Sequence, residues 1–519
     1  MPKRPPPPAC PGHGLSRSGP SPDALRSPQP AATVSTLDLA QRERHAMTQP
    51  SHPHAARVIA VTIAAAVGGF LFGFDSSVIN GAVDSIQDHF ALGSFVTGFT
   101  VAIALLGCAA GAGFAGRLAD SWGRKRVMVL GAVLFIASSI GSGLAFSLWD
   151  LMLWRVIGGL GIGIASVIAP TYISEIAPAA YRGALASMQQ LAITVGIFAA
   201  LLSDALLQNA AGGPANILWW GHEAWRWMFL VGVIPAACYG VLAMLIPESP
   251  RYLVRKHLDD EAGRVLAEFG GELEPGIRVA EIRLTLREEA RSSLADIRGT
   301  AFGLHPVVWV GIGMAILQQF VGINAIFYYS TTLWRSVGFS ESQSFATSVI
   351  TSIINVAMTF VAILFVDRIG RRKLLLAGSI GMFVGLVLAA VAFSQQVGSG
   401  KDVSLPSPWG QLALVGANLF VVFFAATWGP VMWVMLGEMF PNRMRAVAMG
   451  VCTAANWLAN FAVTLAFPPL SEHVGLWLVY GIFALFAGLS YFFVRASVPE
   501  TKGMQLEDMD RLGEASPAR

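Results

Sequence analysis

Charged residues are scarce in this sequence. Asp, Glu, Lys and Arg make up 13% of its 519 residues, whereas 54% are apolar and the mean hydropathy is +0.58. A soluble domain is usually about one quarter charged. A soluble fold of this length could not cover so much apolar surface, so the composition favours a protein embedded in a membrane. The formal net charge of +3 is also too small to suggest a nucleic-acid partner.

Cysteine is almost absent. The four cysteines lie far apart, one in a polar N-terminal region and three in apolar runs: Cys10, Cys108, Cys238 and Cys452. This spacing matches neither a disulfide framework nor a metal-binding pattern. The sequence therefore predicts no metal site and no cofactor, and it assigns the cysteines to ordinary packing.

A nucleotide-binding signature is missing as well. The glycine-rich run at Gly158, Gly159, Gly161 and Gly163 lies inside an apolar segment rather than between a strand and a helix. Phosphate binding is therefore not expected there. In a membrane, such small residues let one helix pack closely on another. Nothing in the sequence indicates an obligate protein partner.

Residues 1–56 differ from the rest of the chain. They are rich in Pro, Ser, Arg and His and contain no apolar run. A secretory signal needs an apolar core of about 7–15 residues, so this leader is not one. We expect it to be disordered. Met47, just before the first apolar run, is an alternative start.

Apolar segments follow that are long enough to cross a bilayer, which takes about 20 residues each. Six precede a polar segment at 248–305, and six follow it. The predicted fold is therefore an all-α membrane protein with an N-terminal six-helix half at 57–247, a cytoplasmic helical linker at 248–305, a C-terminal six-helix half at 306–496 and a polar tail at 497–519. The predicted spans are 57–80, 96–117, 127–147, 150–171, 184–204, 225–246, 306–335, 343–366, 373–394, 409–436, 446–467 and 474–495.

The short loops predict the orientation. Basic residues gather in the loops after the second, fourth, eighth and tenth spans, and the opposite loops carry few. Positive charge marks the cytoplasmic face, so both termini and the linker are expected to be cytoplasmic. Helix-like stretches at 259–269 and 278–291 predict short surface helices in the linker.

The two halves repeat each other. The loop from Gly116 to Lys125 resembles that from Asp367 to Lys373, and an acid precedes an arginine by seven residues in both halves, at Glu175–Arg182 and at Glu438–Arg445. Both pairs follow the fourth span of a half. Repeated halves with polar groups between them are the architecture of a rocking transporter.

Several motifs, taken in order over about residues 57–503, make the sequence resemble the sugar porter branch of the major facilitator superfamily. Within it, Asp75 makes the bacterial proton–xylose symporters the nearest match. The resemblance implies a twelve-helix transporter, not an enzyme, with a central sugar site. The motifs are Gly116–Arg126, Arg155 with Gly158-Gly159, Glu175–Gly183, Pro247–Arg251, Gln318–Asn324, Asp367–Arg372 and Pro499–Gly503.

The predicted spans contain several amide side chains, and six of them are the candidates here. Amides are costly in hydrocarbon unless they face protein or water. They donate and accept hydrogen bonds at once, as sugar hydroxyls do. From residue types alone, they fit hydrogen bonding between helices equally well. The family resemblance favours sugar binding for Gln190, Gln318, Gln319, Asn324, Asn355 and Asn456.

Aromatic residues share these spans, and flat rings can stack on the C–H faces of a sugar. Their ordinary role is core packing. The resemblance makes Trp433 the first candidate for a sugar contact, followed by Tyr328 and Trp457. Phe70 and Tyr329 are assigned to packing, and Trp428 to packing or gating.

Asp75 lies well inside the first span, and Arg155 is the only other ionisable residue at a similar depth in that half. A carboxylate at this depth is costly unless it is paired or protonated, and it marks a functional site by default. A pair that breaks on protonation would couple proton uptake to a change of state. The alternative is a permanent buried ion pair that fixes helix packing.

The charged loop residues can form ion pairs across the cytoplasmic helix ends. Such pairs are individually weak, at about 0–1 kcal/mol, but a network of them can bias a protein with two states. Setting the topology is their other role. Ala446 stands where the family often has glycine, which weakens the second-half motif. The candidates for gating are Arg117, Asp120, Arg124, Glu175, Arg182, Asp367, Arg368, Arg371, Glu438 and Arg445.

The sequence as a whole predicts a proton-coupled symporter that imports a monosaccharide, a pentose or hexose such as D-xylose or D-glucose, across the cell membrane. The partners implied are the sugar, a proton and the lipid bilayer. An uncoupled sugar facilitator, an inositol or polyol symporter and a membrane sugar sensor remain alternatives. A sensor would need a signalling module, and the tail after Gly503 is short.

Overall fold

The computed structural model describes residues 53–176, 182–269, 272, 274–289, 294–299, 301–397 and 404–502. Residues 53–502 belong to one compact unit. The predicted disorder of the leader falls almost wholly outside the described residues, as does most of the predicted tail. The division of the chain into these five parts remains a prediction.

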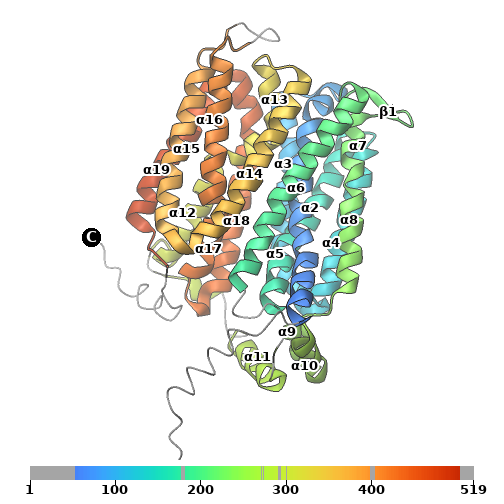
Figure 1. Cartoon of the computed structure of the whole chain (residues 1–519), viewed down its shortest axis with the longest axis vertical. Coiled ribbons are helices and arrows are strands. Elements are labelled where there is room, and N and C mark those ends of the chain that lie inside the picture. The colour runs from blue at the N-terminus through green and yellow to red at the C-terminus, as the bar shows by residue number, and fades with distance from the viewer. Residues whose placement is uncertain are drawn as a thin grey trace, which may run out of the picture. The chain divides into compact units, whose positions relative to one another are not determined.

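The first half contains long helices that run side by side, drawn in blue to green in Figure 1. A small antiparallel hairpin, β1–β2, projects from the loop between its last two spans. The elements are α2 (Pro53–His89), α3 (Ser94–Trp122), α4 (Arg124–Gly143), α5 (Leu148–Ile176), α6 (Arg182–Ala211), β1 (Ile217–Trp219), β2 (His222–Glu223), α7 (Ala224–Val231) and α8 (Val233–Leu245).

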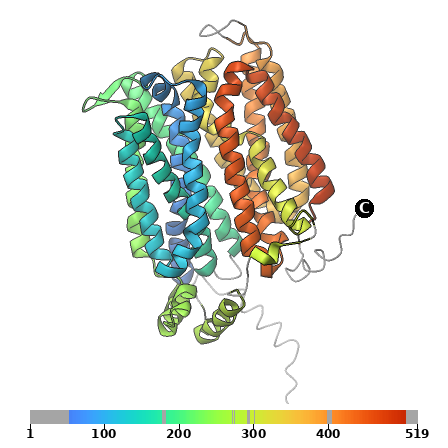
Figure 2. The same ribbon diagram turned by 180° about the vertical axis from the view of Figure 1, so that it is seen from behind.

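The second half is built in the same way and is drawn in yellow to red in Figure 2. Its elements are α12 (Pro306–Phe320), α13 (Ile323–Ser336), α14 (Glu341–Ile369), α15 (Arg371–Phe393), α16 (Trp409–Phe423), η3 (a π turn, Phe424–Trp428), α17 (Gly429–Met439), α18 (Asn442–His473) and α19 (Leu476–Ser497). A short 3₁₀ turn, η1 (Leu294–Ile297), precedes them in the linker.

Twelve helical segments of the described chain are long and apolar enough to cross a membrane. The predicted all-α fold with twelve spans is therefore confirmed. Three spans are each divided into two helices: α7 and α8, α12 and α13, and α16 and α17. Glycine lies at each division, at Gly232, Gly322 and Gly429, and Pro430 follows the last one. Broken helices are where membrane proteins expose backbone groups to a cavity or to other side chains.

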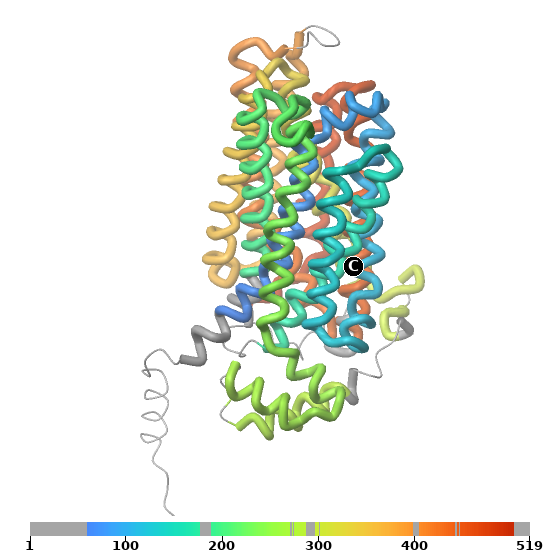
Figure 3. Tube along the Cα trace, turned by 90° about the vertical axis from the view of Figure 1, so that its right-hand side faces the viewer, coloured from blue at the N-terminus to red at the C-terminus, as the bar shows by residue number. Residues whose placement is uncertain are grey.

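The halves meet along three pairs of helices. In each pair one helix comes from either half: α3 with α18, α6 with α14, and α2 with α13. The linker between the halves contains α9 (Pro250–Arg255), α10 (Asp259–Glu268) and α11 (Pro275–Glu289), which lie beneath one end of the bundle in Figure 3. We call this end the insert end and the opposite one the distal end.

The linker helices have a small apolar core of their own, which includes Leu253, Val265 and Val279. Two polar contacts connect α9 to the insert end of α3. Arg255 lies 2.7 Å from Asp120, and the Tyr252 hydroxyl donates to the Ser121 carbonyl at 3.3 Å. The linker is therefore attached to the first half by side-chain contacts as well as by the chain.

Candidate transport site

The break between α12 and α13 assembles the first part of the site. Gly322 adopts φ = +85°, a left-handed conformation that favours glycine, and it separates Gln318 and Gln319 at the end of α12 from Asn324 at the start of α13. A methyl group on Gly322 would also lie 2.3 Å from the Phe483 ring. The turn thus places three amides within two short helices whose ends face each other.

These amides form a continuous chain of hydrogen bonds with Asn456 of α18. Asn324 donates to Gln319 Oε1 at 2.6 Å, and Gln319 donates to Asn456 Oδ1 at 3.1 Å. Asn456 in turn donates to Gln318 Oε1 at 2.9 Å. Gln318 donates to the backbone carbonyls of Trp428 and Gly429 at the broken tenth span. Four of the predicted sugar-binding amides therefore lie together, held by two helix breaks.

Two other predicted amides do not join this chain. Gln190 lies half-buried on α6, and Asn355 lies buried on α14, where its backbone carbonyl accepts from the Thr359 hydroxyl. The helices that carry them, α6 and α14, are one of the pairs along which the halves meet.

The predicted aromatic contacts are distributed around the amides. Trp457 follows Asn456 and packs edge-on against Phe72 of the first half, with 5.5 Å between ring centroids. Tyr328 interacts through its side chain with Asn460 and Ser76, and so it also reaches the first half. Trp433 lies half-buried on α17.

Trp428, which the sequence assigns to packing or gating, is fully buried. Its indole N–H donates to the Leu375 carbonyl at 3.0 Å and to the Ser379 hydroxyl at 3.1 Å. Tyr329 is buried too, and its hydroxyl donates to the Thr464 carbonyl. These contacts tie both rings to neighbouring helices, as packing residues require.

The structure brings Asp75 and Arg155 together. Asp75 lies at the middle of the span formed by Ala60–His89, and Arg155 Nη1 lies 3.3 Å from its Oδ2 atom and 3.4 Å from its backbone oxygen. Both side chains are buried, and Arg155 also lies over the Phe229 ring at 5.9 Å. The Arg155 Nε atom has no hydrogen-bond partner. Only part of the guanidinium's hydrogen-bonding capacity is therefore used.

A cavity of about 10 Å³ adjoins this pair, lined by Asp75, Ser139, Phe135 and Phe229 among others. This volume corresponds to roughly one water molecule. A buried ion pair is stable only if the attraction offsets the loss of hydration of both charges. A water molecule in this cavity would lie beside the Asp75 carboxylate and could pass a proton to it.

The insert end of the first half contains a compact set of polar contacts. The Arg124 guanidinium donates to both oxygens of Glu175, at 3.0 and 2.8 Å, and it contacts Asp120 at 3.2 Å. Ser249 donates to the same Glu175 at 2.5 Å, and Glu248 accepts from the backbone N–H of Arg124 at 2.8 Å. Glu248 therefore caps α4, since an acid at a helix N-terminus satisfies free N–H groups.

The second half repeats most of this arrangement. The Arg371 guanidinium donates to both oxygens of Glu438, at 3.1 and 2.8 Å, and contacts Asp367 at 2.8 Å. Thr501 donates to Glu438 at 2.5 Å, and Glu500 accepts from the backbone N–H of Arg371 at 2.9 Å. Each cluster lies within one half, so each ties a helix end to its own bundle.

The remaining gating candidates are placed differently. Arg117 and Arg368 are exposed, and the Arg445 guanidinium donates to the Phe440 carbonyl. The side chain of Arg182 lies outside the described residues. Arg251, which the gating set omits, lies 4.0 Å from Glu175, and burial lowers the pKa of its guanidinium even beside that carboxylate.

At the distal end, polar contacts join α2 to α13 and therefore join the halves. Thr331 donates to Asn80 through both its backbone N–H and its hydroxyl, at 3.0 and 2.7 Å. Asp84 accepts from Thr332 at 2.7 Å and from Arg335 at 2.6 Å. We call these five residues the distal latch. Sequence reasoning missed it, because polar residues near the end of a span look like residues that face water.

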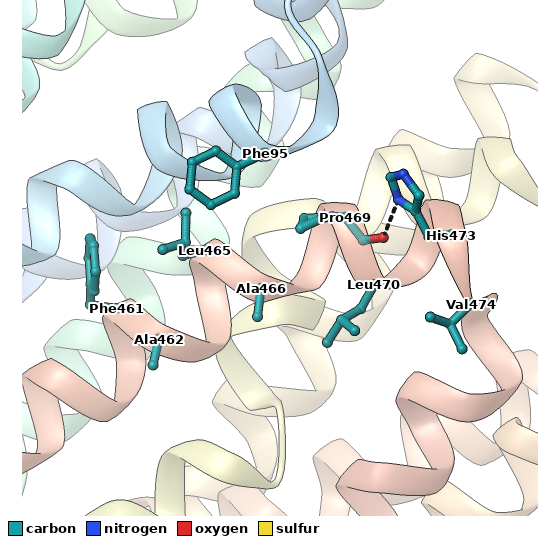
Figure 4. A pocket seen from close by; sticks show the side chains of 9 residues that line it. All are labelled: Phe95, Phe461, Ala462, Leu465, Ala466, Pro469, Leu470, His473 and Val474. Carbon is teal, nitrogen blue, oxygen red and sulfur yellow. Dashed lines mark hydrogen bonds between the residues drawn. The ribbon is translucent and has the colours of Figure 1, made fainter.

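A shallow groove of about 550 Å³ lies near the distal end between α3 and α18 (Figure 4). Its lining is apolar and includes Phe95, Leu465 and Pro469. His473 is the polar exception, and its ring contacts the Pro469 carbonyl at 2.8 Å. A sugar needs several hydrogen-bonding groups, so this groove does not compete with the amide chain as a sugar site.

Comparison with known proteins agrees with this geometry. The sequence model of the family described as "Sugar (and other) transporter" matches residues 61–512. A glucose transport protein from a Synechocystis strain is 51% identical over 453 residues, which cover 87% of this chain and 97% of that relative. The D-xylose-proton symporter of Escherichia coli K12 is 33% identical, over 88% of this chain and 96% of the symporter.

Solved structures give the same result. The partially occluded, inward-open conformation of the xylose transporter XylE from E. coli matches with a TM-score of 0.75 at 32% identity, covering 87% of this chain and 100% of that chain. The proton:xylose symporter XylE bound to 6-bromo-6-deoxy-D-glucose matches with a TM-score of 0.74 at 32% identity, covering 88% and 99%.

Proposed function

This chain belongs to the sugar transporter family of the major facilitator superfamily, and on that premise we propose that it imports a monosaccharide together with a proton by alternating access. It is a multi-pass membrane transporter, and its relatives are transporters rather than enzymes. The finer parts of the proposal are the coupling ion, the sugar and the residues that bind them.

The buried pair of Asp75 and Arg155 supports proton coupling. The carboxylate lies mid-membrane with one cation beside it and space for about one water. Protonation of Asp75 removes its charge and frees Arg155 to take another partner, so proton binding changes the contacts between α2 and α5. A facilitator has no need of such a pair.

The amide chain supports a neutral, hydroxyl-rich substrate. Gln318, Gln319, Asn324 and Asn456 satisfy one another when the site is closed. A sugar can replace these bonds one for one, because each hydroxyl both donates and accepts. Trp457, the neighbour of Asn456 in the sequence, can offer an apolar face, and Trp433 of α17 is the second candidate. A pentose and a hexose differ by one hydroxymethyl group, and the relatives named for glucose and for xylose keep both as candidates.

The distal latch indicates which conformational state of the transport cycle the structure represents. It holds α2 against α13, so the distal end is closed. We propose that the distal end faces outward and that the linker and both termini lie in the cytoplasm, as the basic loops at the insert end favour. The transporter is then closed to the outside, like the inward-open neighbour that it resembles.

The test is uptake of labelled D-xylose and D-glucose into proteoliposomes, with and without an inward proton gradient. We expect the gradient to drive accumulation of one of these sugars. Asp75→Asn should abolish accumulation while sugar still equilibrates, because the amide chain is intact. Asp88→Asn is the matched control, an exposed acid on the same helix, and it should behave as the wild type.

Equilibration that ignores both the gradient and the Asp75 substitution would contradict coupling and leave an uncoupled facilitator. If neither xylose nor glucose moves, the same vesicles should be loaded with inositol and other polyols. Binding of a sugar without any flux would instead support a membrane sensor.

A further inference from the structure

A second carboxyl is buried in the first half, and the transport mechanism above does not use it. Asp204 of α6 is 0% exposed, and neither of its carboxylate oxygens has a hydrogen-bond partner of good geometry. Among the described residues, the Gly81 peptide is the polar group beside it, and Met228 also lies next to Gly81. An isolated carboxylate in such surroundings is far more costly than the neutral acid.

Asp204 belongs to the stripe of α6 that packs against α2. Gln189, Ile193 and Asp204 of α6 meet glycines of α2 in succession, and the last of these is Gly81. A methyl group on Gly81 would lie 2.8 Å from Asp204 Oδ2 and 2.8 Å from Met228 Sδ. The backbone of α2 therefore rests directly on the carboxyl, with no room for a shell of water.

This contact lies next to the distal latch. Gly81 is the direct neighbour of Asn80, whose oxygen accepts both bonds from Thr331, and it lies three residues before Asp84. Asn80 Nδ2 has no partner. The closeness of α2 to Asp204 thus sets the position of the turn of α2 that holds α13.

The charged groups around Asp204 are engaged elsewhere. On α2, Asp75 is bound to Arg155, Asp84 to the latch, and Asp88 and His89 are exposed at the helix end. On α7, Arg226 bonds Glu223 at 2.8 Å and lies over the Trp225 ring at 4.4 Å. The acids and bases of α14 lie at its two ends, at Glu341, Asp367 and Arg368. None of the described cations forms an ion pair with Asp204.

We propose that Asp204 is a second proton-binding site, and that it must carry a proton for the distal end to close. As a neutral acid it lets α2 rest on α6, and Asn80 and Asp84 then reach α13. When it loses the proton, the charge requires water, α2 is displaced from α6, and the latch bonds with α13 are lost. The bound species is a proton, and the step needs neither sugar nor a change at Asp75.

The experiment measures closure directly. Spin labels at Phe146→Cys and Val397→Cys, exposed residues at the distal ends of the first and second halves, report the separation of the halves by double electron–electron resonance. Cys10 and the exposed Cys238 are first replaced by serine. Measured without sugar, the wild type should move from the short to the long distance as the pH is raised. Asp204→Asn should keep the short distance throughout.

Further variants test the same proposal. Gly81→Ala introduces a methyl group where α2 rests on the carboxyl, so it should favour the long distance even at low pH. His89→Gln should keep the pH response, because it does not remove the proposed site. If Asp204→Asn shifts with pH as the wild type does, or Gly81→Ala closes normally, the proposal is wrong.

These outcomes are separate from those of the uptake assay. Coupled uptake that Asp75→Asn abolishes, together with a distance in Asp204→Asn that follows pH as in the wild type, would retain symport and reject the second site. If only Asp204→Asn removes the pH response, and uptake by the wild type ignores the proton gradient, the second site would be supported and symport would be rejected.

Discussion

The two halves share the same framework at the insert end and differ at the middle of the membrane. Arg124, Glu175 and Glu248 of the first half have counterparts in Arg371, Glu438 and Glu500, with donor–acceptor distances that agree within 0.1 Å. Deeper in, the acids and arginines buried among the described residues lie in the first half, whereas the hydrogen-bonded chain of four amides lies in the second. The repeated part holds helix ends, which both bundles need, and the differing part gives each half its own chemistry.

This division has a physical reason. A proton site needs a group whose charge changes, and such a group must be shielded from water to influence helix packing. A sugar site needs many donors and acceptors without net charge. Asp75, Arg155 and Asp204 meet the first requirement, and Gln318, Gln319 and Asn456 meet the second. Keeping the two sets in separate halves lets each be adjusted alone, while rocking couples them.

The largest expected effect is a difference in thermal stability between variants of the two matching clusters at the insert end. Glu175 and Glu438 accept matching bonds, but their side chains are 5% and 29% exposed. Removing one partner of a buried pair costs about 3–5 kcal/mol, and an exposed pair contributes about 0–1 kcal/mol. Glu175→Gln should therefore lower the unfolding temperature in detergent clearly more than Glu438→Gln.

The two variants are each other's control, since the substitution and the bonds lost are the same. Intrinsic tryptophan fluorescence on heating gives both midpoints under one condition. Equal losses would mean that burial does not distinguish the halves. A larger loss in Glu438→Gln would reverse the comparison.

The next effect separates sugar chemistry from proton chemistry. Gln319→Leu removes the amide that links Asn324 to Asn456 and leaves both with unmet bonds. An unsatisfied buried polar group costs about 1–3 kcal/mol, so sugar affinity should fall by about 10- to 100-fold. Equilibrium binding of labelled sugar measures this loss.

The pH-dependent distance between the halves should be unchanged in Gln319→Leu, because its first-half acids are intact. Gln395→Leu, an exposed amide at the distal end of the second half, is the matched control and should bind sugar normally. Loss of the pH response along with sugar binding would show that the two sites are not separable.

Much of this architecture could be predicted from the sequence. Twelve apolar runs, the repeated charged loops and the amides around Gly322 are local patterns, and the bend there follows from one glycine. Asp75 and Arg155 could be paired because ionisable residues are rare at that depth. The roles of other residues depend on contacts between positions far apart in the sequence. Glu248, for example, caps a helix that begins 124 residues earlier in the chain.

Asp204 and the distal latch illustrate the limit more sharply. Asp204 lies seven residues before the end of its span, and Asp84 lies five before the end of α2. By position alone, both are acids close to water. Only packing distinguishes them, because Asp204 faces a glycine of the neighbouring helix, whereas Asp84 meets Arg335 and Thr332 across the two halves.

The smallest expected effect concerns that latch. The side chains of Arg335 and Asp84 are 41% and 21% exposed, so their ion pair should contribute only about 0–1 kcal/mol. Arg335→Gln should therefore shift the balance between open and closed distal ends by at most about fivefold, toward open. The same double electron–electron resonance pair reads this shift, and the shift should shrink in about 1 M salt, which screens an exposed pair in the wild type as well.

Thr331→Val provides the contrast within the latch. Thr331 is buried, and its hydroxyl donates to the Asn80 carbonyl, so its loss leaves an acceptor unmet and should open the distal end whatever the salt concentration. If Arg335→Gln opened the distal end more than Thr331→Val does, the exposed charges would dominate closure. The argument that the buried part of α2, which rests on Asp204, controls the latch would then fail.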